Sequence, residues 1–152
     1  MRTILLTDDS RNIREYCRGV LEDDGYRVVL AADGLEALRV FREVSPDLVI
    51  LETWMPRMTG LEALARLKAM APEVPVILFT AHDEDCVRDP RGSLAAACVE
   101  KSADLSELTR TIERVFRPTS PRERGVPSRL GLPPAPGGGA ALESVPCWGG
   151  KL

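Results

Sequence analysis

The sequence predicts a doubly wound α/β domain with a five-stranded parallel sheet, followed by a disordered C-terminal tail. Short, almost wholly apolar runs alternate with segments in which apolar residues recur every three or four positions. The first pattern is typical of strands buried on both faces, and the second of amphipathic helices. Strict alternation of the two favours right-handed crossovers, which place helices on both faces of the sheet.

The first half of the chain contains three predicted strands, at residues 4–7, 27–31 and 47–51. Between the first two, apolar residues at i, i+4, i+7 and i+8 from Ile13 predict a helix that stops at Gly25. A second helix, with apolar positions 35, 38 and 41, is expected to close before Pro46, because the residue preceding a proline disfavours helical geometry.

The second half continues the alternation less regularly. A helix with apolar residues at 61, 64 and 67 precedes a strand at 74–79, and a weaker strand is expected at 95–99. A helix is due between them, but Pro90 and Gly92 predict that it is short, broken or mobile, since they cost about 3 and 1 kcal/mol in a helix interior. Residues 104–107 predict a capping box for the last helix, which ends near Phe116.

Polar residues follow the predicted strands at their carboxyl ends. Asp8 and Asp9 follow the first strand, and Glu52 follows the third. Thr80 ends the fourth strand, and Lys101 follows the fifth. Open α/β sheets bind their ligands at this edge, so we expect these side chains to form one acidic pocket. Converging carboxylates repel one another unless cations neutralise them, which Lys101 and a divalent metal ion can do.

Composition excludes several classes of function. Residues 1–116 contain 15 Lys and Arg against 21 Asp and Glu, a net charge of −6, which argues against nucleic-acid binding by this domain. No apolar run approaches the roughly 20 residues of a membrane span. The four cysteines show neither a C-x-x-C pair nor the spacing of a metal site, and we therefore expect a reduced, cytoplasmic protein. Phosphate-binding glycine motifs are also absent from the sequence.

The predicted strands and helices, with the polar residues that follow the strands, resemble in their order the receiver domain of bacterial two-component response regulators. The resemblance covers residues 2–116 and implies a flavodoxin-like fold. It also implies that Glu52 occupies the position of the Asp that accepts a phosphoryl group from a histidine kinase. In the family the magnesium ligands match Asp9, Glu52 and the backbone carbonyl of Trp54, with Asp8 acting through water. We leave open whether this chain still binds Mg²⁺.

The same resemblance assigns a switch to Thr80 and Lys101, which respond to phosphorylation in the family. Cys98 stands where the family commonly has a Tyr or Phe that moves inward on activation. We interpret Cys98 as a small apolar filler, with a redox-sensitive thiol as the alternative. Because this aromatic residue is absent, we expect the partner face that the family builds from its fourth helix, fifth strand and fifth helix to differ in this chain.

The extra methylene of Glu52 supports two interpretations. It displaces the carboxylate by roughly 1.5 Å, and misplacement on that scale can slow phosphoryl transfer by ~10²-fold. The longer side chain can also enter the volume of a phosphoryl group and imitate it in part, with one charge instead of nearly two.

The sequence therefore predicts a stand-alone, atypical (pseudo-) receiver in phosphorelay signal transduction, in which Glu52 mimics or replaces phospho-Asp. It is expected to be a monomer or weak homodimer, to lack enzymatic activity and to bind protein partners, such as a histidine kinase or a downstream effector. A scaffold with a vestigial pocket, a slow phosphoacceptor and a small phosphatase or nucleotide-binding enzyme remain as alternatives.

The domain is expected to span residues 1–117 and the tail residues 118–152. Pro and Gly make up 14 of the last 36 residues, a share typical of disordered segments.

Overall fold

Five parallel strands form one sheet in the order β2-β1-β3-β4-β5, which confirms the predicted doubly wound fold class. The computed structural model describes residues 1–102 and 104–117, so the predicted tail lies outside the described residues. The strands are β1 (Thr3–Thr7), β2 (Arg27–Ala31), β3 (Leu48–Leu51), β4 (Val76–Thr80) and β5 (Ala97–Glu100).

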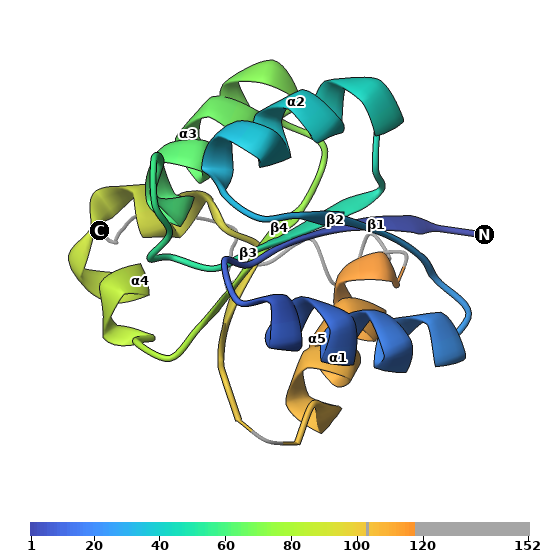
Figure 1. The fold of residues 1–152 in the computed structure, drawn as a ribbon. Coiled ribbons are helices and arrows are strands. Elements are labelled where there is room, and N and C mark those ends of the chain that lie inside the picture. The colour runs from blue at the N-terminus through green and yellow to red at the C-terminus, as the bar shows by residue number, and fades with distance from the viewer. Residues whose placement is uncertain (103, 118–152) are drawn as a thin grey trace, which may run out of the picture. The chain divides into compact units, whose positions relative to one another are not determined.

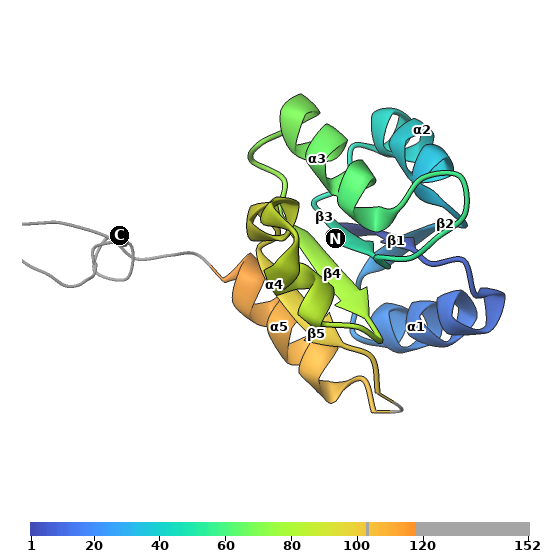
Figure 2. The same ribbon diagram turned by 90° about the vertical axis from the view of Figure 1, so that its left-hand side faces the viewer.

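Helices cover both faces of this sheet. They are α1 (Arg11–Asp23), α2 (Gly34–Val44), α3 (Gly60–Met70), α4 (Glu84–Arg88), the 3-10 helix η1 (Pro90–Leu94) and α5 (Ser106–Phe116). Figure 1 shows α2 and α3 above the sheet and α1 and α5 below it. In Figure 2, α4 lies beside β4 and β5, at the end of the sheet opposite β2. No described helix is long and apolar enough to cross a membrane.

The central strands are buried on both faces, as their apolar sequences predict. All four residues of β3 are inaccessible to solvent, and so are Ile4, Leu5 and Leu6 of β1. The helices contribute side chains such as Leu64 and Ile112 to the two layers above and below. This packing fixes the strand ends, and with them the polar residues at the rim.

Local sequence signals set where the helices begin. The side chain of Ser10 accepts the backbone N–H of Ile13 to cap α1. A capping box joins Thr59 and Glu62 at α3. At α5, Asp104 caps the helix start as predicted, but its side chain accepts the N–H of Ser106 and not that of Glu107, so the structure shows a simple cap in place of the predicted box.

The segment between β4 and β5 is broken, as Pro90 and Gly92 predict. It contains the five-residue α4 and, after Asp89, the five-residue η1. Gly92 is required there, since a Cβ at this position would lie 2.0 Å from the backbone oxygen of Cys86. The two short helices therefore pack backbone against backbone.

Candidate functional site

The sheet brings four of the predicted site residues to one rim. Main-chain hydrogen bonds extend the ladders past the strand ends, from Glu52 N to Thr7 O (3.0 Å) and from Lys101 N to Thr80 O (2.8 Å). Asp8, directly after β1, is 1% exposed, and Thr80 is fully buried. These residues therefore surround one small polar site in an otherwise apolar sheet.

Lys101 is the cation at the centre of this site. Its ammonium group forms an ion pair with Oδ2 of Asp8 at 2.6 Å and a second, shorter one with Oε1 of Glu52. It also lies over the Phe79 ring, 5.8 Å from the ring centroid. One positive charge therefore joins two carboxylates that would otherwise repel each other.

Glu52 is almost buried, and both of its carboxylate oxygens have partners. Oε2 accepts the backbone N–H groups of Thr53 (2.7 Å) and Trp54 (3.4 Å) and the Thr53 hydroxyl (3.1 Å). Burial raises the pKa of Glu52, but its bonds to Lys101 and Thr53 outweigh that effect and hold the pKa below its ordinary value. Glu52 is thus held as a carboxylate in this site.

Asp8 behaves differently although it shares the same lysine. Burial raises the pKa of Asp8 above its ordinary value, and its contacts with Lys101 and with the N–H of Ser10 offset this only in part. The two carboxyl groups therefore differ in proton affinity, with Asp8 the one that takes up a proton more readily.

A chain of hydroxyl groups connects Glu52 to Thr80. The Thr53 hydroxyl donates to Glu52, so its oxygen accepts from the Thr80 hydroxyl at 2.7 Å. The Thr80 oxygen in turn accepts the backbone N–H of His82 at 3.0 Å. Sequence reasoning missed Thr53, and the only available signal was its place directly after Glu52 at a strand end.

The backbone around Glu52 is fixed by a close approach of the chain. Gly60 donates its N–H to the carbonyl of Thr53 at 2.8 Å, and a Cβ on Gly60 would lie 1.9 Å from the carbonyl oxygen of Glu52. Only glycine fits such an approach without displacing the backbone. Gly60 therefore positions the turn that carries Glu52, Thr53 and Trp54.

The described side chains do not fit a magnesium site in this arrangement. Mg²⁺ needs carboxylate oxygens free to act as ligands, but those of Asp8 and Glu52 both engage Lys101. Among the described residues, Asp9 is the one predicted carboxylate ligand without such a contact, and it is exposed. Within that part of the chain, no three acidic, cysteine or histidine side chains gather as metal ligands.

Cys98 is bonded to Cys86, which corrects two interpretations made from the sequence. The disulfide joins α4 to β5, with the two Cα atoms 6.5 Å apart. Cys98 is therefore not a simple apolar filler, and these two cysteines are not reduced thiols here. Cys17 stays free and buried, and Cys147 lies outside the described residues.

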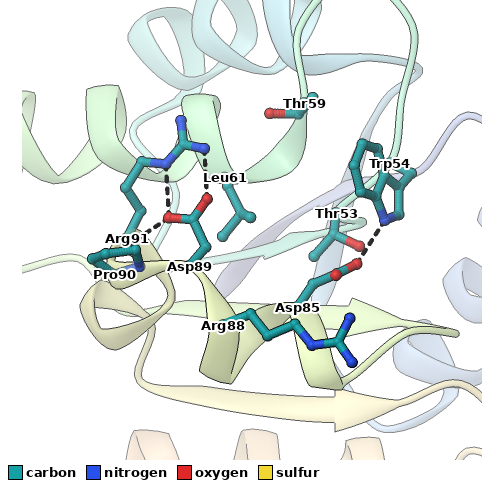
Figure 3. Close-up of a pocket in the computed structure, with 9 residues that line it drawn as sticks. All are labelled: Thr53, Trp54, Thr59, Leu61, Asp85, Arg88, Asp89, Pro90 and Arg91. Carbon is teal, nitrogen blue, oxygen red and sulfur yellow. Dashed lines mark hydrogen bonds and ion pairs between the residues drawn. The ribbon is translucent and has the colours of Figure 1, made fainter.

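A shallow hollow of about 350 Å³ lies next to the site. Trp54 stands on its wall with 58% of the residue exposed, and its indole N–H donates to Asp85 at 2.6 Å (Figure 3). Across the hollow, Asp89 forms an ion pair with Arg91 at 2.7 Å. Trp54 therefore links the turn after Glu52 to α4.

The fold has counterparts among known proteins. Residues 4–113 match the family described as the response regulator receiver domain. The chain is 37% identical over 123 residues to the response regulator MprA of Mycobacterium sp. strain KMS, covering 79% of this chain and 53% of MprA. The chain thus spans about half the length of the curated relatives it matches.

Two solved structures are also similar to this chain in three dimensions. The response regulator TrrA of Thermotoga maritima, in complex with Mg(2+)-BeF, aligns with a TM-score of 0.73 and 34% identity, covering 76% of this chain and all of that one. TrrA in complex with the histidine kinase ThkA aligns with a TM-score of 0.71 and 34% identity, covering 77% of this chain and all of TrrA.

Proposed function

The chain belongs to the response regulator receiver family of two-component signalling, and on that premise we propose that Glu52, rather than a transferred phosphoryl group, sets its signalling state. In this proposal the domain is an atypical receiver without enzymatic activity. Glu52 stands at the position of the phosphoacceptor Asp and substitutes for its modified form.

The contact between Glu52 and Lys101 carries this proposal. A phosphoryl group on the acceptor would offer negative oxygens to the lysine at this rim, and the Glu52 carboxylate already offers one. The contact lies in a nearly buried site, where a charge-assisted hydrogen bond is strong. Because the pKa of Glu52 is lowered, the carboxylate keeps its charge at neutral pH.

The hydroxyl chain supports the proposal that the charge of Glu52 affects the loop before α4. In the proposed mechanism the Glu52 carboxylate holds Thr53, which orients Thr80, which in turn fixes the loop that starts at His82. A negative charge at Glu52 is thereby transmitted to the loop that leads into α4. Binding of a target to this region would then need no phosphorylation step.

Partners are inferred from the family and from the structural relatives. Receivers act through other proteins, and TrrA has been seen bound to the histidine kinase ThkA. For this chain we propose a protein partner, either a kinase or a downstream effector. The acidic charge of residues 1–116 disfavours nucleic acid as the partner of this domain.

Beryllofluoride offers a direct test, because TrrA binds it together with Mg²⁺. Glu52→Asp restores the shorter acid and should bind Mg²⁺ and beryllofluoride. If Glu52 mimics the phosphorylated state, backbone amide NMR shifts of residues 80–101 in the unmodified protein should match the beryllofluoride complex of Glu52→Asp. They should differ from those of Glu52→Asp alone.

The opposite result would support a scaffold with a vestigial pocket. In that case the unmodified protein would match ligand-free Glu52→Asp, and beryllofluoride would produce a state that the unmodified chain never adopts. Glu107→Gln removes an exposed acidic charge on α5 and serves as the control. Its shifts should stay those of the unmodified protein at residues 80–101.

A further inference from the structure

Helix α4 is attached to the domain by few noncovalent contacts. It has only five residues, buries none of them and lacks a side-chain cap at its N-terminus. Val87, its most apolar side chain, is 87% exposed. Elements with so little buried apolar surface open locally at low cost, and a helix this short is not stable by itself.

A covalent bond makes up for this weak packing. The disulfide from Cys86 in α4 to Cys98 in β5 closes a loop with a sequence separation of 12 residues. Both cysteines are only half-buried, so a small thiol can reach the bond. Cleavage of this bond would leave α4 with the packing of Cys86 against the core, the Trp54–Asp85 hydrogen bond and the backbone contact at Gly92.

The disulfide also belongs to a ring of contacts around the functional site. Cys98 lies on β5, three residues before Lys101, which follows the strand and forms an ion pair with Glu52. From Glu52 the chain leads within two residues to Trp54, whose indole donates to Asp85, the neighbour of Cys86. A change at the disulfide therefore acts on an element that is already coupled to the acidic pocket.

We propose that Cys86 and Cys98 form a site of reversible thiol–disulfide exchange that locks and releases α4. A low-molecular-weight thiol attacks one sulfur as its thiolate, breaks the Cys86–Cys98 bond and forms a mixed disulfide. A second thiol resolves it, so both cysteines end as protonated thiols and two small thiols are oxidised to one disulfide. The surface of α4 and β5 is then a redox-responsive surface, whatever the role of Glu52.

Hydrogen exchange on the full chain tests the lock directly. In protein purified without reductant, amides of residues 84–94 should exchange slowly. Addition of a reducing thiol should accelerate them by about tenfold or more, with α3 and α5 unchanged, and oxidised glutathione should restore slow exchange. Cys86→Ser with Cys98→Ser should exchange fast under both conditions, while Cys17→Ser should behave as the unmodified protein.

Three results would overturn the proposal. The first is alkylation of Cys86 and Cys98 in protein that was never reduced, which would show that the bond does not form. The second is equal exchange of residues 84–94 before and after reduction. The third is a disulfide that persists in reduced glutathione until the whole domain unfolds, which would make it a structural staple. None of these readouts involves Glu52, so they are independent of the proposed function.

Discussion

Lys101 and Glu52 form an ion pair that water hardly reaches, since their side chains are 16% and 9% exposed. Buried pairs of this kind cost desolvation energy, which their mutual attraction and further hydrogen bonds must offset. Here Glu52 gains such bonds from Thr53, and Lys101 gains a second carboxylate from Asp8. Removal of either partner should therefore lower the stability of the domain as well as alter its signalling.

Glu52→Gln should destabilise the domain by about 1–3 kcal/mol in urea unfolding, because Lys101 keeps Asp8 but loses its other anion. Lys101→Met should cost more, about 3–5 kcal/mol, since it leaves two carboxylates in the site without a cation. The double variant should be no less stable than Lys101→Met, because the contact is already lost. Additive losses would show that the two side chains do not interact.

The same pair predicts a pH dependence with a definite sign. Glu52 has a folded-state pKa below its ordinary 4.5, so the native state holds fewer protons there than the unfolded state. Its contribution to stability is complete above pH 4.5 and is lost as the pH falls through the lowered folded-state pKa. The stability difference between the unmodified protein and Glu52→Gln should thus shrink on acidification.

Asp8 should give a pH dependence of stability with the opposite sign. Its pKa lies above the ordinary 3.8, so the native state holds more protons and Asp8 favours folding less as the pH rises. Asp8→Asn should therefore become relatively more favourable between 3.8 and the raised pKa. If the difference in unfolding free energy from the unmodified protein does not change with pH for either variant, the assigned pKa shifts are contradicted.

The fold was largely predictable because its signals are local. Apolar strands and three- to four-residue periodicity identified nine elements, and Pro90 with Gly92 correctly indicated that the helix expected between the last two strands is broken. The capping box at Thr59 and Glu62 was overlooked, although its Thr-x-x-Glu pattern is visible in the sequence. At residues 104–107 the capping residue Asp104 was predicted correctly, but its side chain accepts the N–H of Ser106 instead of that of Glu107.

The site was predictable only where it follows from the topology. Parallel strands end at one edge, so Asp8, Glu52, Thr80 and Lys101 had to lie near one another. The disulfide could not be predicted in this way, since Cys86 and Cys98 show no spacing motif and meet only when α4 packs on β5. The hydroxyl chain through Thr53 likewise depends on side-chain orientation, which the sequence does not determine.

Magnesium binding provides a further prediction. Lys101 forms ion pairs with both Asp8 and Glu52, so it should compete with Mg²⁺ for their carboxylate oxygens. In a Trp148→Phe background, quenching of Trp54 by Mg²⁺ should be weak, and Lys101→Met should raise the affinity by about tenfold or more. Adding Asp8→Asn to Lys101→Met should abolish the gain. Equal titrations with and without Lys101 would show that the lysine does not compete.

Gly60 allows a prediction about the backbone with an internal control. Gly60→Ala places a methyl group 1.9 Å from the Glu52 carbonyl oxygen, which is backbone and cannot move aside as a side chain could. The turn must shift, and overpacking of this kind costs about 1–3 kcal/mol. Because that turn carries Glu52 and Thr53, the shift should also weaken the pairing of Glu52 with Lys101.

Gly19 supplies the matched control, since it lies inside α1 and a Cβ there meets nothing within 4 Å. Gly19→Ala should therefore stabilise the protein by up to about 1 kcal/mol through helix propensity alone. Urea unfolding should move the two variants in opposite directions, and only Gly60→Ala should change the amide shifts of Glu52 and Lys101. A stable Gly60→Ala variant with unchanged shifts would show that the close approach at Gly60 does not position the acidic pocket.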